Sequence, residues 1–133
     1  MVFVDASALI AIIAGEPEAA DFADRLDRGT VRLCSALVIW ETVAGLCRGY
    51  TFSVPAARAH VERFLTIASI IWVAIGEREF AAAADAYAQY GKGRHPAALN
   101  MGDCFAYACA RTNRARLLFK GDEFTKTDIE TAS

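Results

Sequence analysis

Apolar residues lie along the chain in short continuous runs separated by longer stretches with helical spacing. The short runs are rich in β-branched and aromatic residues and predict strands at residues 2–4, 31–34, 70–75 and 117–119. The run at 70–75 is almost entirely apolar, which is typical of a strand covered on both faces. A fifth short strand is added if residues 128–129 also pair with the sheet.

The segments between these runs have the spacing of amphipathic helices. Predicted helices cover residues 7–14, 18–28, 36–48, 54–68, 77–90 and 100–113. Gly15, Gly29 and Gly49 end the first three, and residues 91–99 form a loop. Strands that alternate with helices predict an α/β fold, a three-layer α/β/α domain with a central parallel sheet of four to five strands.

The composition predicts one domain with an apolar surface to cover. The 133 residues contain no linker-like stretch, so we expect a single domain over residues 1–133. The chain is 55% hydrophobic with a mean hydropathy of +0.26, which predicts burial against a partner, most simply in a homodimer. Residues 65–76, the longest apolar run, are too few to cross a bilayer, and Asp5 interrupts the segment where a signal peptide would be apolar. We therefore expect a cytoplasmic protein outside the membrane.

The cysteines and histidines do not indicate a site. The four cysteines lie singly in apolar segments without a Cys-x-x-Cys pair, which predicts buried thiols: Cys34, Cys47, Cys104 and Cys109. His60 and His95 are expected at the surface.

The charge distribution is uneven although the net charge is only -2. Basic residues crowd the last third of the chain: Lys92, Arg94, Arg111, Arg114, Arg116, Lys120 and Lys126. This crowding fits a solvated basic face and a phosphate-binding face equally well.

Two acidic residues in the first half stand where a charge is unexpected. Asp5 directly follows the first strand, where open α/β sheets place ligand-binding residues, although it also suits the N-cap of the next helix. Glu41 lies on the apolar face of its helix, where an unpaired charge is costly to bury. A buried ion pair with an arginine is the alternative to a shared site.

Two further acids lie near the end of the chain. Asp103 is three residues after Asn100, as in a helix capping arrangement, and Asp122 follows the last strand in a turn. Because the carboxyl ends of parallel strands share one edge of a sheet, Asp5 and Asp122 should emerge together there. The helices that carry Glu41 and Asp103 can point their first turns toward the same edge.

Four converging carboxylates repel one another unless a cation neutralises them. Mg²⁺ is the hard, oxygen-preferring ion that suits such a set, and Mn²⁺ is the alternative. The chemistry predicted is metal-assisted phosphoryl transfer, with one or two ions activating water and holding the scissile phosphate.

The chain resembles the PIN-domain ribonucleases, and among them the VapC-type toxins of bacterial toxin-antitoxin pairs. The resemblance covers nearly the whole sequence through four motifs: Val-Asp-Ala-Ser-Ala-Leu at 4–9 followed by Gly-Glu-Pro-Glu, Ser-Ala-Leu at 35–37 leading to Glu41, residues 99–108, and residues 118–124 with Thr125, Thr127 and Asp128. The third and fourth motifs, with acids nineteen positions apart (122 minus 103), are the most specific.

The resemblance implies metal-dependent endonucleolytic cleavage of RNA that leaves 5′-phosphate and 3′-hydroxyl ends and inhibits translation and growth. It assigns metal binding and catalysis to four carboxylates, Asp5, Glu41, Asp103 and Asp122. It also implies supporting residues that orient water or a carboxylate, contact the substrate or add an outer acid: Ser7, Asn100, Thr125 and Asp128.

The resemblance further implies a homodimer and a small VapB-like antitoxin. The antitoxin's C-terminal segment would lie along the toxin and place an arginine or lysine in the acid site. Contact with DNA would occur only through the antitoxin.

Other functions compete with this interpretation. A receiver-like phosphoacceptor domain needs an aspartate after its central strand, and the run at 70–76 ends without one. A haloacid-dehalogenase-like phosphatase needs a second aspartate where Ser7 stands. A catalytically idle PIN-fold binding module is the remaining alternative, and the four acids argue against it.

Overall fold

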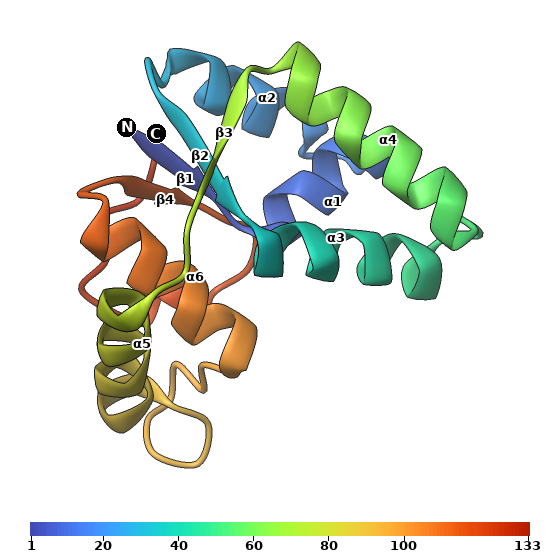
Figure 1. Cartoon of the computed structure of the whole chain (residues 1–133). Helices are drawn as coiled ribbons and strands as arrows, with labels where there is room; N and C mark the ends of the chain where they lie inside the picture. Colours follow the sequence, from blue (N-terminus) through green and yellow to red (C-terminus); the bar gives the residue numbers. More distant parts are fainter.

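The computed structural model describes all residues, 1–133. Figure 1 shows its strands and helices, which in chain order are β1 (Val2–Val4), α1 (Ala6–Ala14), α2 (Ala19–Arg28), β2 (Arg32–Ser35), α3 (Ala36–Gly49), α4 (Val54–Ile67), β3 (Ile70–Val73), α5 (Glu77–Tyr90), α6 (Met101–Thr112), β4 (Arg116–Leu118) and the short 3-10 helix η1 (Phe124–Lys126). Each predicted helix is present, with ends that differ by at most one residue. None of the helices is long and apolar enough to span a membrane.

The four strands form one parallel sheet in the order β3-β2-β1-β4, which confirms the predicted α/β class. The central strand β1 pairs Phe3 with Leu33 on one side and with Leu117 on the other. A fifth strand at residues 128–129 does not form. The C-terminal segment instead contributes a single parallel bridge between Leu117 and Thr131.

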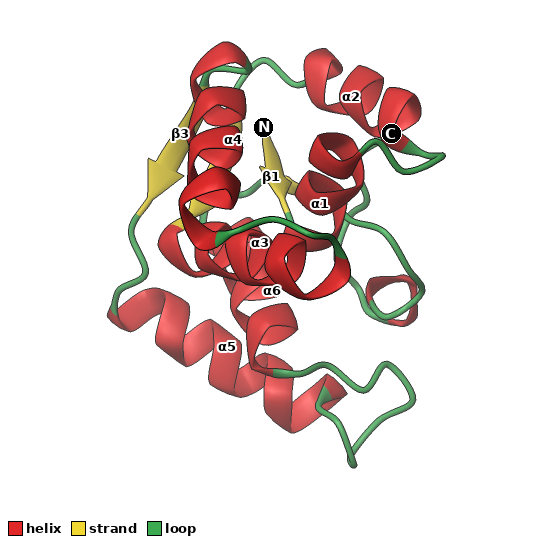
Figure 2. Ribbon diagram, turned by 90° about the vertical axis from the view of Figure 1, so that its right-hand side faces the viewer, coloured by secondary structure: helices red, strands yellow, loops and turns green.

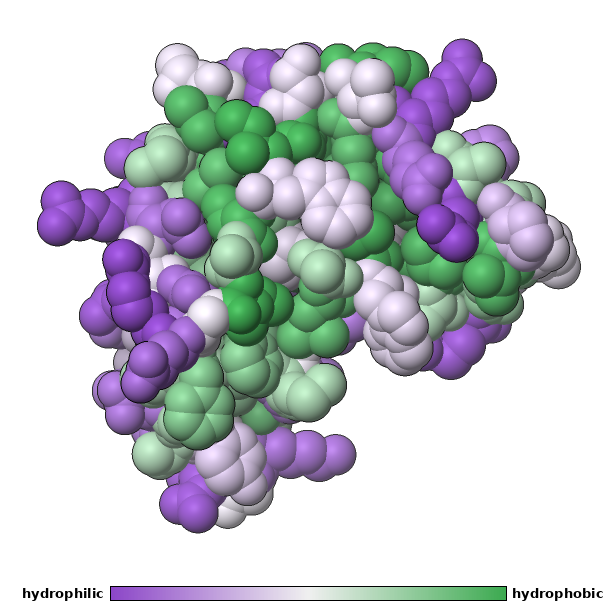
Figure 3. Space-filling view, viewed as in Figure 1, coloured by the Kyte–Doolittle hydropathy of each residue, from purple (hydrophilic) through white to green (hydrophobic).

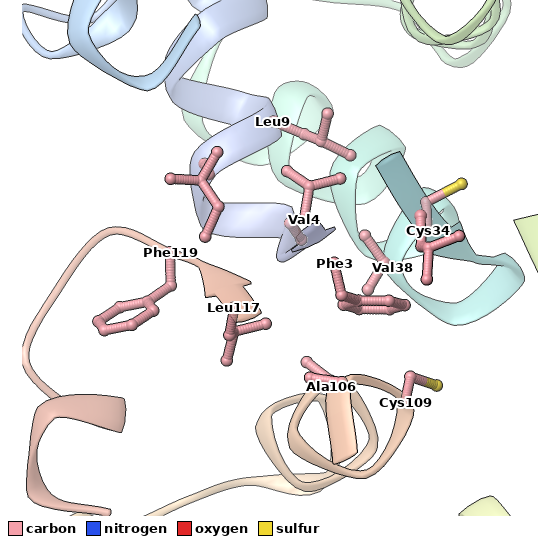
Figure 4. Close-up of a cluster of buried hydrophobic side chains, with 14 of the residues drawn as sticks. Phe3, Val4, Leu9, Cys34, Val38, Ala106, Cys109, Leu117 and Phe119 are labelled. Carbon is pink, nitrogen blue, oxygen red and sulfur yellow. The ribbon is translucent and has the colours of Figure 1, made fainter. Parts of the chain in front are cut away.

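Helices cover both sides of the sheet, as Figures 1 and 2 show. Helices α1 to α4 lie on one side, and α5 and α6 pack together on the other. Figure 4 shows Leu9 of α1 and Ala106 of α6 on opposite sides of Phe3 and Val4. These residues belong to one core of 37 buried hydrophobic side chains. The layers hold β1, and therefore the residue that follows it, in a rigid position.

The prediction that the strand at 70–75 is covered on both faces is wrong. β3 ends at Val73 and lies at the edge of the sheet, where Ile71 and Trp72 are 55% and 54% exposed. The reason is topological, because the α5-α6 layer packs against β1 and β4 and leaves β3 uncovered on that side.

The cysteines are free, as predicted: Cys34, Cys104 and Cys109 are buried and Cys47 is half-buried. His60 is exposed as expected. His95 is half-buried instead, because its Nδ1 accepts a hydrogen bond of 3.0 Å from the Ala97 amide.

Candidate active site

Asp5 is the first carboxylate at the carboxyl edge of the sheet. It directly follows β1, caps α1 and is only 7% exposed. The amide and the hydroxyl of Ser7 both donate to Asp5 Oδ2, at 3.1 and 2.6 Å. Burial raises the pKa of Asp5, and the hydrogen bonds from Ser7 oppose that effect. The N-cap interpretation is therefore correct, and capping employs only one carboxylate oxygen.

Ser7 connects Asp5 to the loop after β4. Its Oγ accepts a hydrogen bond of 2.9 Å from the backbone amide of Lys120. The ammonium group of Lys120 pairs with Glu16 at 2.7 Å and with Glu18 at 3.0 Å, which ties the same loop to the turn between α1 and α2. Ser7 thus fixes Asp5 with respect to two loops at this edge, in agreement with an orienting role.

Glu41 brings a second carboxylate from α3, and the charge of Arg48 only partly offsets the effects that raise its pKa. It forms no salt bridge or hydrogen bond, so the alternative of a buried ion pair with an arginine is wrong. Its carboxylate lies against Gly102 of α6, where an added methyl group would overlap it. Burial, followed by the charges of Asp5 and Asp103, raises the pKa of Glu41 to about 7. A partly buried carboxylate near two other acids does not stabilise the fold, so its presence requires another reason.

Asp103 is the third carboxylate, in the first turn of α6. It forms a capping box with Asn100: the Asp103 amide donates to Asn100 Oδ1 at 2.8 Å, and the Asn100 amide donates to Asp103 Oδ2 at 3.1 Å. Burial is the largest cause that raises the pKa of Asp103 to about 6, and Asp5 and Glu123 raise it further. The backbone bond from Asn100 acts in the opposite direction. The backbone amide of Asn100 therefore fixes the orientation of the Asp103 carboxylate.

The loop after β4 differs from the expectation. Asp122 is exposed, and its charge has no resolved effect on the pKa of Asp5, Glu41 or Asp103. Its neighbour Glu123 instead raises the pKa of both Asp5 and Asp103. Glu123, which is also exposed, therefore acts electrostatically on two of the three carboxylates, an effect that the sequence interpretation missed.

The Glu123 carboxylate lies beside Gly121. Gly121 has φ +106°, and a Cβ there would lie 2.7 Å from Glu123 Oε2. The only available signal in the sequence was the acidic pair itself after Gly121, and spacing alone does not choose between two consecutive acids.

The last two supporting residues lie outside this group. Thr125 donates its hydroxyl to the backbone carbonyl of Asp122 at 2.6 Å, which closes the turn rather than orienting a carboxylate. Asp128 accepts hydrogen bonds from the Tyr107 hydroxyl and from Arg111, and the Tyr107 bond lowers its pKa. Asp128 therefore ties the C-terminal segment to α6 and does not act on the other acids.

The donor set suits a hard divalent cation. Asp5 and Asp103 use Oδ2 in these hydrogen bonds, so their Oδ1 atoms are free to bind a ligand. No three acidic, histidine or cysteine side chains form a ready metal-binding group. Mg²⁺ commonly binds one or two carboxylates and completes its shell with water and phosphate oxygens, which this arrangement allows.

Comparison with known proteins identifies the class that this fold and site define. The model of the PIN domain family matches residues 2–130, so the chain belongs to the PIN-domain family. Ribonuclease VapC30 of Mycobacterium tuberculosis is 39% identical over 130 residues, which cover 98% of this chain and 97% of that protein. A ribonuclease VapC of Mycolicibacterium smegmatis is 40% identical over 126 residues and 95% of each chain. Within the family, the chain groups with the VapC ribonucleases.

Solved structures share the fold at lower identity. The Mycobacterium tuberculosis toxin VapC20, described as cleaving the sarcin-ricin loop, has a TM-score of 0.73 and 20% identity over 100% of both chains. VapBC2 of Rickettsia felis, bound to a DNA fragment from its promoter, gives a TM-score of 0.75 at 11% identity over 98% of this chain and 96% of that one. These similarities confirm the fold that the family match indicates.

Proposed function

We propose that this chain is a metal-dependent endoribonuclease and the toxin of a VapBC-like toxin-antitoxin pair, which inhibits translation and growth by cleaving RNA. The observation that carries the proposal is that Asp5 and Asp103, from two other elements, both act electrostatically on Glu41, which forms no ion pair. The similarity of the chain to VapC ribonucleases supports RNA as the substrate.

In this mechanism the metal site consists of Asp5, Glu41 and Asp103, with an acid of the 121–123 turn completing it. A Mg²⁺ or Mn²⁺ ion bound there would activate a water and neutralise charge on the phosphodiester. The protein contributes geometry: Ser7 fixes Asp5, and Asn100 fixes Asp103. Without metal, burial raises the pKa of Glu41 to about 7, and a bound cation would favour its charged form.

The test is cleavage of total bacterial RNA by the wild type and Asp103→Asn, each with Mg²⁺, Mn²⁺ or EDTA. Asp85→Asn is the matched control, because Asp85 is an exposed acid of α5 without an ion pair. Discrete fragments that require both metal and Asp103 support the proposal. Identical results for the wild type and Asp103→Asn under every condition would favour the idle binding module.

The structure has two exposed apolar faces, which we assign to a second copy of the chain and to the antitoxin. Between α5 and α6, a hollow of about 240 Å³ is lined only by apolar residues, including the exposed Phe80 and Met101. Homodimer interfaces are more apolar than other interfaces, so we assign this face to a second copy of the chain. A groove of about 330 Å³ between α3, α4 and β3 has Arg58 and Glu62 among apolar walls, which suits a mixed antitoxin segment better.

Figure 3 shows hydrophobic side chains gathered on the face that carries β3 and α4. The exposed Trp40 and Trp72 belong to the lining of the α3-α4-β3 groove. Phe80→Asp should produce a monomer in light scattering and still bind the antitoxin, whereas Trp72→Asp should lose the antitoxin and remain dimeric. The opposite pattern would exchange the two assignments.

We expect DNA to be bound only through the antitoxin. A cytoplasmic location fits both the action on cellular RNA and the free cysteines.

A further inference from the structure

A second charged site lies at the amino edge of the sheet, opposite the carboxylates. There a pocket of about 320 Å³ is lined by four arginines from two parts of the chain: Arg25, Arg28, Arg114 and Arg116. Glu130 is the only acidic side chain in its lining. The pocket therefore carries excess positive charge although the whole chain is mildly acidic.

Two of these arginines have no partner. Arg25 pairs with Asp21 at 2.7 Å, and Arg116 with Glu130 at 3.4 Å. Arg28 and Arg114 form no ion pair. Guanidinium groups that share one pocket repel one another, and a bound anion would relieve that repulsion.

The helix dipole does not account for the cluster. Arg25 and Arg28 lie in the last turn of α2, where cations are favourable in any helix. Arg114 and Arg116 come from the turn after α6 and from β4. Arg114 has φ +54°, a left-handed conformation that glycine or asparagine adopts more easily. The chain places an arginine there in spite of this preference.

We propose that the pocket binds a phosphate group of the RNA backbone, away from the bond that is cut. The planar fork of arginine matches phosphate oxygens in a bidentate manner, and Arg28 and Arg114 offer two such forks without an ion-pair partner. The three residues of β1 separate it from Asp5 by about 10 Å along the strand. The choice of RNA as the source of the phosphate rests on the proposed function, whereas phosphate binding itself does not.

The experiment measures binding of a fluorescein-labelled single-stranded RNA to protein carrying Asp103→Asn, which prevents cleavage. Arg28→Gln and Arg114→Gln are each compared with Arg63→Gln, which removes one exposed, unpaired charge from α4. Each pocket variant should reduce the slope of log K against log salt by about 0.7, equivalent to about five-fold in affinity near 0.1 M salt. Arg63→Gln should leave the salt slope and the affinity unchanged. Thermal melts establish that all three variants are folded.

A second measurement separates the possible sources of the phosphate. Inorganic pyrophosphate is added to the wild type and to both pocket variants during a thermal melt. Stabilisation of the wild type alone, with RNA binding unchanged in the variants, would assign the pocket to a free phosphate compound. Unchanged RNA binding together with no effect of pyrophosphate would overturn the inference. Because wild-type RNA cleavage is assayed separately, such a failure would leave the proposed ribonuclease function intact.

Discussion

Replacing Glu41 by glutamine should stabilise the metal-free protein above neutral pH. The amide has the same size as the carboxylate, so it fits against Gly102 without a new overlap. It removes a charge that burial and two neighbouring acids, Asp5 and Asp103, disfavour. The glutamine variant should also lose RNA cleavage, because the group that completes the site is gone.

The size of the effect follows from the pKa of Glu41, which is about 7 in the folded protein and ordinarily 4.5. The folded state therefore binds more protons than the unfolded state between these values, and wild-type stability falls as pH rises through that window. A difference of this size corresponds to about 3 kcal/mol, and partial exposure of the side chain reduces it to about 2 kcal/mol. Glu41→Gln lacks this dependence, so its advantage appears only as pH increases.

Urea unfolding in EDTA at several pH values between about 4 and 8 measures the effect. Asp85→Asn serves as the control, because it removes an exposed carboxylate without changing the site. Added Mg²⁺ should then stabilise the wild type more than Glu41→Gln, since binding to the folded state adds to stability. A loss of stability in Glu41→Gln that is the same at every pH would show that the carboxylate makes a stabilising contact, and the reasoning would be wrong.

Substitutions at four further positions test the site. Gly102→Ala should reduce cleavage strongly with little loss of melting temperature, because its methyl group displaces the end of the flexible Glu41 side chain while alanine favours the helix by up to about 1 kcal/mol. Glu123→Gln should reduce cleavage more than Asp122→Asn in parallel assays, and the reverse order would return the role to Asp122. Ser7→Ala should slow cleavage by about ten-fold through loss of the hydroxyl bond to Asp5, and Ser7→Thr should restore part of the rate.

Local signals explain why the helices could be predicted from sequence. Ser35 and Asn100 cap α3 and α6 with their side chains, and Gly15 ends α1 in a left-handed conformation. Such interactions span only a few residues, so they can be recognised in a linear sequence. The same locality placed Asp5 at the end of β1 and Asp103 at the start of α6.

Features that depend on distant neighbours were harder to predict. The apolar character of residues 70–75 indicated a strand, but only the strand order shows that β3 is an edge left exposed on one side. Residues 128–129 do not form a strand, and the chain pairs with β4 only further on, at Thr131. Likewise, the electrostatic effect of Glu123 on Asp5 and Asp103 could not be predicted from two consecutive acids after a glycine.

The net charge of -2 conceals a separation of charge between the two edges of the sheet. Acids gather where the strands end, and unpaired arginines gather where they begin. RNA approaching the acidic edge alone would be repelled, so affinity must come from cations, either metal ions at that edge or arginines elsewhere. If the arginines supply part of it, RNA should still bind in EDTA, more weakly as salt rises, while cleavage stops completely. Binding that disappears together with the metal would instead place all of the affinity at the carboxylates.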